Sequence, residues 1–555
     1  MPSSSQTGTT PAGGMRMSLA AALHAAGEVA AERLAVVQGD RRLTYAELHS
    51  RASRIAALLK DRGVGAGNTV AVGLHNGPEY LETVLAAFLL GAIPVNINYR
   101  YREPELEYVL NYVEAAALVY DDGLADRVRH VTGSLPRLKA VLQVGPEVAE
   151  PAISYDEAAT TGPELPWTGD PGSTDGIILL TGGTTGRPKG VIWDRNGLLG
   201  ILTAVFRLNG LTVPTTADEV REGVRALAEQ GNVPVILPMS PLMHGTGFFN
   251  TTRTLLAGGT ICFCTSRSLD GHEVWGVVQK YGVTEMVIVG DAFGRPLVAA
   301  LAEAEQAGKP YDISSLRRIG SSGVAWSIDV KRALLARGSM LLADNISASE
   351  GGPFANAEAR SEADLADSRF TLAPVARLLD ENDQDVVPGS GQVGVLASAG
   401  PQPVGYLGDP ERTARTWRVI DGVRYAIPGD LATLDADGKL VLLGRGDGVI
   451  NTGGEKVFPE EVEQALLAHP EITDAAVFGV PDPRWGQRVT ALIAPAAALK
   501  GISDEELTAH LNEELARYKH PRRLIRTDGI PRTPAGKLNR TLARELAVKI
   551  EEEQQ

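Results

Sequence analysis

Hydrophobic positions in the first part of the chain alternate between helical and strand-like spacing. Residues 43–63 place apolar side chains three and four positions apart, and Thr44 with Glu47 forms a capping-box pattern at their start. Short apolar runs at 69–74 and 117–121 are typical of buried strands. Because helices and such strands take turns, the pattern predicts an α/β fold built on a mostly parallel sheet.

The longest apolar run, residues 84–95, is too short to span a bilayer and contains Pro94. It predicts a buried helix that continues into a strand. The alternation of helices and strands resumes at 176–342. Residues 369–443 differ, because short strands are separated there by PGSG, LGDP and DADG turns, which predict a small β-rich unit.

A compact α/β module follows GRGD at 444–447, and no sequence period repeats along the chain, which argues against a solenoid. The expected organisation has four segments. These are a disordered tail at 1–17, a large N-terminal domain at 18–446, a small C-terminal domain at 447–546 and a charged tail at 547–555.

The composition is that of an ordinary globular protein, with 44% hydrophobic and 22% charged residues among 555. Acidic residues outnumber basic ones by 68 to 53, so the net charge of −15 argues against nucleic acid or an anionic membrane as main partner. Cys262 and Cys264 cannot build a disulfide framework and are expected to be buried free thiols. The polar start of the chain lacks a secretion signal, so we expect a cytoplasmic protein without integral membrane association.

A glycine-rich segment, TGGTTGRPKG at 181–190, directly follows the apolar run GIILL at 176–180. Glycines let backbone N–H groups approach a polyphosphate, threonine hydroxyls donate hydrogen bonds, and Lys189 supplies positive charge. Pro188 precedes this lysine, so the segment is not a Walker A loop. A glycine-rich turn without a ligand is the alternative, but no turn type requires the paired threonines. The predicted phosphate-binding residues are Thr181, Gly182, Gly183, Thr184, Thr185, Gly186 and Lys189.

This loop resembles the phosphate loop of the adenylate-forming superfamily, which includes acyl-CoA synthetases, luciferases and peptide-synthetase adenylation domains. Further phrases in the same order as in that family are SPLMHG, VGDAFGRPL, GVRYAIPGD, INTGGEKVFPEEVE and RTPAGK. The wording is most similar to actinobacterial acyl-CoA synthetases that act on fatty acids and steroid side chains, and the resemblance covers about residues 18–546. It implies a large N-terminal domain of two α/β sheets and a β-rich unit, followed by a mobile α/β C-terminal domain.

The resemblance also implies a site for ATP and Mg²⁺. Glu350 and Thr185 would hold Mg²⁺, and Asp430 and Arg445 would bind the ribose side of the nucleotide. The catalytic residues would be Lys189, Glu350 and the mobile Lys537. Residues of the adenine loop and the ISASE segment complete the nucleotide site: Ser322, Gly323, Val324, Ala325 and Ser349.

An acid pocket and a CoA path follow from the same resemblance. The pocket would be lined by His244, Phe248, Asp291 and Ser347, Gly453 and Gly454 would border the CoA path, and Asp447 would be the hinge. Ile346 and Ser347 replace an aromatic residue and a glycine of the family pattern, so substrate identity does not transfer. The basic run RYKHPRR at 517–523 either contacts the CoA phosphates or is a solvated turn.

The expected reaction joins a fatty, steroid side-chain or aryl acid to AMP and then to CoA. One rival keeps the nucleotide chemistry but changes the acceptor or the activated group, as in an acyl-AMP ligase or a nitrite-dependent diazotisation of an aryl amine. The other rival is a non-catalytic nucleotide-binding protein, against which the joint presence of Lys189, Glu350, Asp430 and Lys537 argues. The sequence does not decide whether the protein is a homodimer. The volume and polarity of the cavity beside Ser347 would distinguish the substrate classes.

Overall fold

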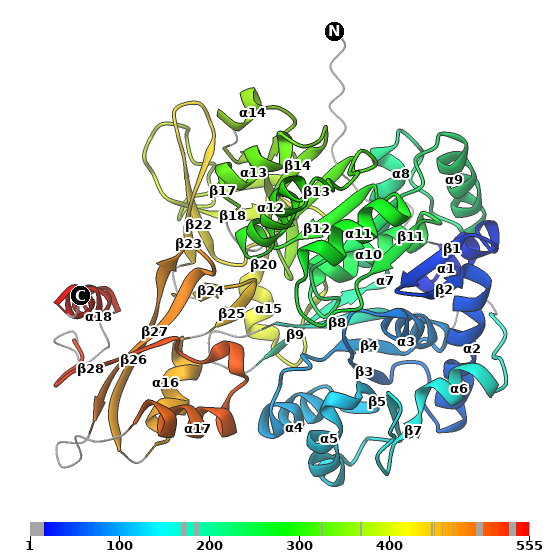
Figure 1. The fold of residues 1–555 in the computed structure, drawn as a ribbon, viewed down its shortest axis with the longest axis horizontal. Coiled ribbons are helices and arrows are strands. Elements are labelled where there is room, and N and C mark those ends of the chain that lie inside the picture. The colour runs from blue at the N-terminus through cyan, green and yellow to red at the C-terminus, as the bar shows by residue number, and fades with distance from the viewer. Residues whose placement is uncertain are drawn as a thin grey trace.

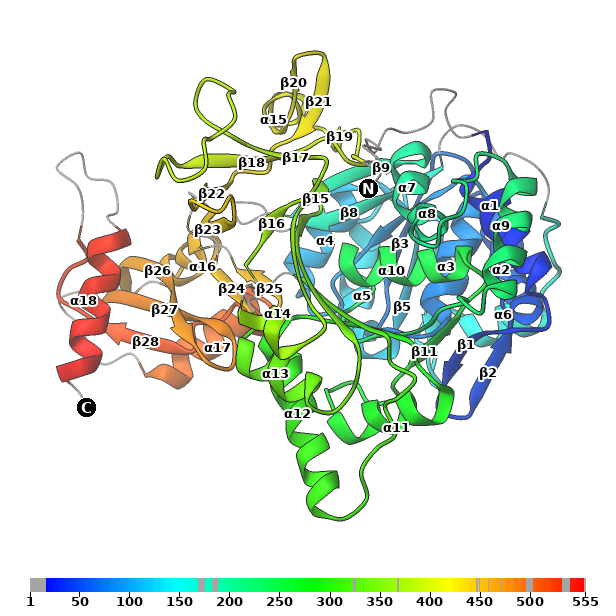
Figure 2. The same cartoon turned by 90° about the horizontal axis from the view of Figure 1, so that it is seen from above.

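The computed structural model describes residues 16–167, 175–181, 188–322, 326–366, 369–445, 448, 450–457, 459–469, 471–495, 503–531 and 540–553. Among these residues the strands form four sheets. The C-terminal module, coloured orange and red, lies to one side of the rest of the chain in both views (Figures 1 and 2).

The first sheet is a parallel α/β sheet, as the sequence pattern predicts. Strands β3 to β8 pair in parallel, and β9 and β19 extend the sheet antiparallel beyond β8. Successive side chains of its strands point to opposite faces, so α2 and α3 bury one face while α4 and α5 bury the other. The strands are β3 (Thr69–Gly73), β4 (Ile93–Asn96), β5 (Ala115–Asp121), β6 (Ala140–Val144), β7 (Ile153–Ser154), β8 (Gly176–Thr181), β9 (Lys189–Asp194) and β19 (Gly405–Tyr406). The helices are α2 (Tyr45–Asp61), α3 (Pro78–Leu89), α4 (Glu103–Tyr112), α5 (Ala125–Val131), α6 (Tyr155–Thr161), η1 (Asp122–Leu124) and η2 (Thr132–Ser134).

The second sheet has a parallel centre and antiparallel edges. Its strand order is β16-β15-β14-β13-β12-β10-β11-β1-β2, with β2, β15 and β16 antiparallel to their neighbours. Helices α11, α12 and α13 cover one face, and α1 and α10 cover the other. The strands are β1 (Leu34–Gln38), β2 (Arg41–Thr44), β10 (Val235–Pro238), β11 (Thr260–Phe263), β12 (Glu285–Ile288), β13 (Arg318–Ser322), β14 (Leu341–Ala348), β15 (Gly351–Ala359) and β16 (Thr371–Leu372). The helices are α1 (Leu19–Val29), α7 (Arg195–Leu202), α8 (Ala204–Leu208), α9 (Ala217–Glu229), α10 (Gly245–Leu256), α11 (Gly271–Tyr281), α12 (Gly290–Gln306), α13 (Ile328–Leu335) and α14 (Glu362–Ala366).

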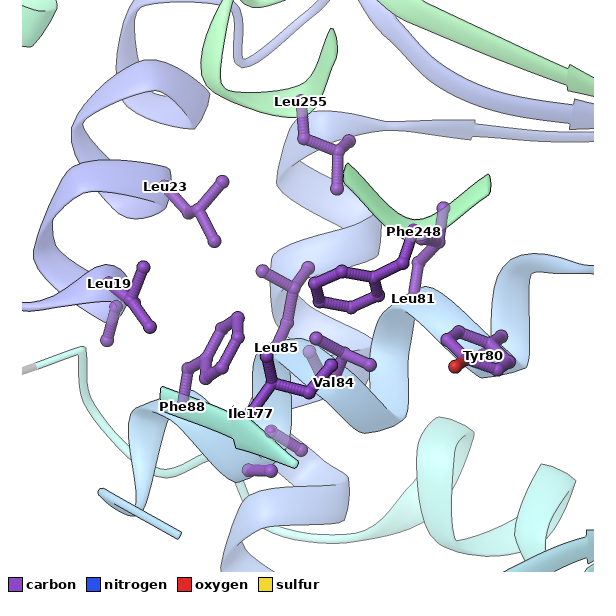
Figure 3. Close-up of a cluster of buried hydrophobic side chains, with 14 of the residues drawn as sticks. Leu19, Leu23, Tyr80, Leu81, Val84, Leu85, Phe88, Ile177, Phe248 and Leu255 are labelled. Carbon is purple, nitrogen blue, oxygen red and sulfur yellow. The ribbon is translucent and has the colours of Figure 1, made fainter. Parts of the chain in front are cut away.

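The main hydrophobic core lies between these two sheets. Helices α1, α3 and α10 meet there, and Figure 3 shows Leu23, Leu85, Phe88 and Phe248 turned toward one another. The burial of such side chains contributes about 1.5–3 kcal/mol each. This core therefore fixes α10 against the first sheet, with the opposite side of the helix free to face a site.

Two smaller units complete the chain. The β-rich unit predicted at 369–443 is an antiparallel sheet. Its strands are β17 (Ala376–Leu379), β18 (Gly394–Ser398), β20 (Trp417–Ile420), β21 (Val423–Ala426), β22 (Asp430–Leu434) and β23 (Leu440–Arg445). Helix α15 (Pro410–Thr416) directly precedes β20. The C-terminal module has a sheet of β24 (Ile450–Thr452), β25 (Glu455–Val457), β26 (Ile472–Asp482), β27 (Gly486–Pro495) and β28 (Arg523–Arg526). Helices α16 (Pro459–Leu467) and α17 (Asp504–Glu514) pack on one face, α18 (Arg540–Glu553) packs on the other, and η3 (Arg517–Lys519) precedes β28.

Several local predictions can be compared with the structure. The capping box at Thr44 and Glu47 is present at the start of α2, and the apolar run at 84–95 ends α3 and forms β4. Cys262 is buried in β11 and Cys264 is half-buried just after it, and both are free. No helix in the described ranges is long and apolar enough to cross a bilayer.

Candidate active site

A cavity of about 390 Å³ opens where the two large sheets meet the C-terminal module. Its wall includes the end of β8, the β14–β15 hairpin, one side of α10 and the turn between β24 and β25. Segments separated by several hundred residues in the sequence thus border one space. Ligand sites of α/β proteins are expected in this position, beyond the carboxyl ends of parallel strands.

The phosphate loop is anchored as a β-hairpin at the edge of this cavity. Thr181 ends β8 and is paired with Lys189, the first residue of β9. Thr181 and Pro188 line the cavity. Buried Asn96 accepts a hydrogen bond of 2.6 Å from the Leu180 backbone N–H and donates to the Met243 carbonyl, which ties β8 to the segment before α10. The predicted loop residues Gly182, Gly183, Thr184, Thr185 and Gly186 lie outside the described residues.

Glu350 is held in a two-residue turn between β14 and β15. The indole N–H of Trp193 donates to the Ser349 carbonyl and that of Trp417 donates to the Glu350 carbonyl, each at 3.0 Å. The Tyr406 hydroxyl donates to Glu350 Oε1 at 2.8 Å. The side chain is buried, and its Oε2 makes no hydrogen bond to any residue that the structure describes. A buried carboxylate with one oxygen available fits a hard cation such as Mg²⁺.

The other predicted nucleotide-binding residues that the structure describes lie on strands β13, β22 and β23 and in the turn after β14. Asp430, at the start of β22, is the Cα partner of Arg445 on β23, so the backbone brings these two predicted residues together. Ser322 ends β13, and its hydroxyl lies 3.2 Å from that of Ser347 on β14. Both serines line the cavity, and Ser349 does too. Gly323, Val324 and Ala325 lie outside the described residues, as do Asp447 and Lys537.

The C-terminal module reaches the cavity through a glycine turn. Gly453 and Gly454 have φ values of +59° and +84°. A Cβ atom on Gly454 would lie 2.7 Å from Cγ1 of Val289, which leads into α12. Both the left-handed backbone and this close approach require glycine. Gly454 lines the cavity, so the predicted CoA path borders the same space as the phosphate hairpin.

Charged side chains join the module to the N-terminal part beside this turn. Glu455 pairs with Arg100, and its Oε2 lies 3.3 Å from Nε2 of His244. Burial alone raises the pKa of Glu455, but His244 and Arg100 together lower it to about 2. Glu455 is therefore ionised at neutral pH. His244 lines the cavity, and its Nε2 lies beside this carboxylate without a hydrogen bond among the described residues.

Lys519 connects the two parts in a second cluster. It is 3% exposed, and its ammonium group lies 2.6 Å from Glu105 and 2.5 Å from Glu461. Burial raises the pKa of Glu461 to about 7, although Lys519 acts in the opposite direction. The sequence offered a CoA contact or a solvated turn for this basic run. Lys519 is not part of a solvated turn, because it is buried between the two parts of the chain. It also lines the cavity, and a contact with the CoA phosphates stays a prediction.

The structure places two predicted pocket residues elsewhere. Phe248 packs in the core between the sheets (Figure 3), and its neighbour Phe249 lines the cavity instead. Asp291 lies in the first turn of α12, where it accepts a hydrogen bond from the Ser327 N–H and pairs with Arg295. Neither Phe248 nor Asp291 is among the described cavity-lining residues.

Sequence reasoning missed the polar side of α10. Thr246, Phe249, Asn250 and Arg253 recur at helical spacing and line the cavity, while the other faces of α10 are buried. This spacing was readable in the sequence, but it becomes informative only once the sheet opposite the helix is known. Arg318, at the start of β13, also lines the cavity and belongs to no motif.

Family models match both parts of the chain. The model described as "AMP-binding enzyme" matches residues 23–406, and "AMP-binding enzyme C-terminal domain" matches residues 461–537. The chain belongs to the AMP-binding enzyme family. The resemblance to adenylate-forming enzymes is thereby confirmed.

Curated relatives of this AMP-binding enzyme are CoA ligases. The chain is 38% identical over 519 residues to the medium/long-chain-fatty-acid–CoA/3-oxocholest-4-en-26-oate–CoA ligase of Mycolicibacterium smegmatis, covering 91% of this chain and 92% of that protein. It is 37% identical over 532 residues to the 3-oxocholest-4-en-26-oate–CoA ligase of Rhodococcus rhodochrous, covering 94% of each. The prediction of an AMP-forming ligase of the acyl-CoA synthetase type is confirmed at the level of the family, whose acyl-CoA ligases use ATP and CoA.

Solved structures agree on the fold. The amide bond synthetase McbA from Marinactinospora thermotolerans superimposes with a TM-score of 0.78 at 24% identity, covering 96% of this chain and 99% of that one. The o-succinylbenzoate CoA synthetase from Bacillus subtilis gives 0.76 at 23% identity, with 94% and 98% covered. These likenesses confirm the predicted α/β fold of a large N-terminal and a small C-terminal domain.

Proposed function

We propose that this enzyme activates a carboxylic acid with ATP, releasing pyrophosphate, and then transfers the acyl group from AMP to the thiol of CoA. The observation that carries the proposal is the shared cavity. The phosphate hairpin at Thr181 and the glycine turn at Gly454 border one space, so an acyl-adenylate formed at the hairpin would already lie beside the CoA path. Relatives named as CoA ligases support the same acceptor.

Adenylation needs positioning and charge more than acid–base chemistry. A carboxylic acid with an ordinary pKa near 4 is ionised at neutral pH and can attack the α-phosphorus directly. Lys189, the loop from Gly182 to Gly186 and Lys537 would stabilise the transferring phosphoryl group and the departing pyrophosphate. Mg²⁺, when bound, would supply further positive charge at these phosphates, held by Glu350 and Thr185.

Other residues would orient the nucleotide. The Asp430 carboxylate would accept hydrogen bonds from both ribose hydroxyls, supported by Arg445, because a carboxylate has two acceptor oxygens for a vicinal diol. The adenine would lie against the loop from Ser322 to Ala325, with Ser349 near the phosphates. These assignments rest on the family pattern, and the cavity positions of Ser322 and Ser349 support them.

Thioester formation would use the face closed by the C-terminal module. The turn at Gly453 and Gly454, which would border the pantetheine arm, packs closely against Trp485 and Val289 because neither glycine has a side chain. His244 and Glu455 lie 3.3 Å apart beside this turn and would order the wall of the CoA path. Asp447 would be the hinge that divides domains 18–446 and 447–546 and lets Lys537 approach and leave. A cytoplasmic location and a homodimer remain predictions.

The decisive assay measures pyrophosphate release for a panel of fatty, steroid side-chain and aryl acids, with and without CoA. We expect acid-dependent release and formation of an acyl-CoA in equal amount. If an acyl-adenylate forms with the acid but does not react with CoA, the result would favour an acyl-AMP ligase. Release that requires nitrite and an aryl amine would favour diazotisation, and the absence of release under every condition would favour a non-catalytic nucleotide-binding protein.

A further inference from the structure

The acid side of the cavity carries several polar side chains among its apolar ones. Helix α10 turns Thr246, Asn250 and Arg253 toward the cavity, with Phe249 as the apolar member of that face. Across the space lie Asn345 and Ser347 of β14. A tunnel for a long alkyl chain would be lined by apolar side chains, because buried polar groups lose hydration without replacement.

Arg318 is the most distinctive group on this wall. It begins β13 and lines the cavity together with Gly320 and Ser322, which share its face of the strand. Its guanidinium lies over Gly320, since a Cβ added there would be 3.9 Å from both Cζ and Nη1 of Arg318. The guanidinium therefore extends along the sheet toward the nucleotide end, and the missing side chain at position 320 leaves room for it.

The charge of Arg318 has no direct partner among the residues that the structure describes. The nearby acid Glu285 is its Cα partner on β12, but Glu285 instead forms a 3.1 Å ion pair with Arg253. Burial lowers the pKa of the Arg318 guanidinium, Arg253 lowers it further, and Glu285 and the exposed Glu358 only partly oppose this. Arg318 thus keeps its charge beside the Arg253–Glu285 ion pair and has no ion-pair partner of its own among the described residues.

A half-buried guanidinium without an ion pair fits an anionic ligand. Arginine presents a planar fork of N–H donors that binds a carboxylate through two parallel hydrogen bonds. The nucleotide phosphates are assigned to the other end of the cavity, at the hairpin of Thr181 and Lys189. The ligand group that meets Arg318 would therefore belong to the acid substrate.

We propose that the acid carries a second carboxylate, bound by Arg318 with Arg253 beside it, while the first carboxylate is activated near Ser322. This inference rests on the proposed function and narrows it from carboxylic acids in general to dicarboxylic acids. The expected distance between the two carboxylates follows from the rise per residue along β13. Gly320 and Ser322 are two residues apart, which is about 7 Å along β13, so short aliphatic or aromatic diacids match the distance.

The test compares diacids with partners of equal shape that lack the second charge. Pyrophosphate release is measured for adipate, suberate, sebacate and terephthalate, each against its monomethyl ester. The wild-type enzyme should prefer the best diacid over its ester by about tenfold or more in kcat/KM, because a charge-assisted pair is lost in the ester. Arg318→Met should abolish this preference and leave the KM for ATP unchanged.

Arg317→Met is the matched control, since Arg317 is the preceding residue and is exposed. It should keep the wild-type preference, and Arg318→Lys, which retains the charge, should keep part of it. Esters that react as well as diacids in the wild-type enzyme would overturn the inference while leaving the proposed function intact. An unchanged preference in Arg318→Met would overturn it as well. Absence of pyrophosphate release with every acid would instead refute the proposed function, and the inference with it.

Discussion

The two ends of the cavity are built in different ways. The end proposed to bind the nucleotide is assembled from loops and turns that the sequence marks with glycine, threonine and lysine motifs, such as the hairpin at Thr181 and Lys189. The acid end is assembled from regular elements, one side of α10 and the start of β13, where Arg253 and Arg318 carry no motif. Residues for chemistry that a family shares can thus be found from sequence motifs. Residues that select the substrate lie at single positions of helices and strands and carry no motif.

The largest effect is expected for a variant that impairs only the proposed nucleotide end of the cavity. Lys537→Ala should lower the rate of adenylation by about 100- to 1,000-fold, because it removes a charge needed as pyrophosphate departs. Transfer to CoA from a preformed acyl-adenylate should be nearly unchanged. The two half-reactions are measured separately, with synthetic acyl-adenylate for the second.

Gly454→Ala should instead impair the transfer to CoA and spare adenylation. Its Cβ would lie 2.7 Å from Val289 in a left-handed backbone, so the thioester step should fall while the first pyrophosphate burst persists. Equal losses in both half-reactions for either variant would contradict the assignment of Lys537 to one step and Gly454 to the other.

A smaller effect is expected at the ribose. Asp430→Ala should raise the KM for ATP by roughly 5- to 150-fold, since unpaired hydroxyls cost about 1–3 kcal/mol. The ratio of kcat/KM between a diacid and its ester should not change, because the proposed role of Asp430 is to bind the ribose. An unchanged ATP dependence would return Asp430 to a structural role in β22.

Glu285→Gln sharpens the acid end. It removes the carboxylate that pairs with Arg253 at 3.1 Å, so the net positive charge facing the substrate rises. Preference for a diacid over its ester should increase by a few-fold, about 1 kcal/mol for a partly exposed charge. The KM for ATP serves as the internal control. A decreased preference would show that Glu285 supports substrate binding rather than competing with it.

The smallest effect concerns pH and the contact of the C-terminal module. Burial raises the pKa of Glu461 to about 7 from an ordinary value of 4.5. Between these values the folded protein keeps a proton that the unfolded chain releases, so stability falls as pH rises from 4.5 to 7. Glu461→Gln should flatten the fall of Tm over this window. Glu505→Gln, at an exposed position of α17, should retain it, and parallel profiles for all three proteins would contradict the shifted pKa.

Much of the fold could be predicted from local patterns. The capping box at Thr44 and the apolar runs of β3 and β5 have short-range physical causes, so they were readable without a structure. The candidate site was readable only where a motif marks it. Phe248 and Phe249 are neighbours with the same side chain, and only the packing of α10 against the core decides which one faces the cavity. The Lys519 cluster likewise joins Glu105 to Glu461 across the sequence, and no local pattern encodes such a pairing.

The central claim is that a carboxylate oxygen of the substrate attacks the α-phosphorus of ATP in this cavity. An acid labelled with ¹⁸O in its carboxyl group tests it directly, with AMP and acyl-CoA analysed by mass spectrometry after a single turnover. One ¹⁸O atom is expected in AMP for each acyl-CoA formed, because the acyl–oxygen bond breaks when the thiol attacks. AMP that contains no label would contradict it.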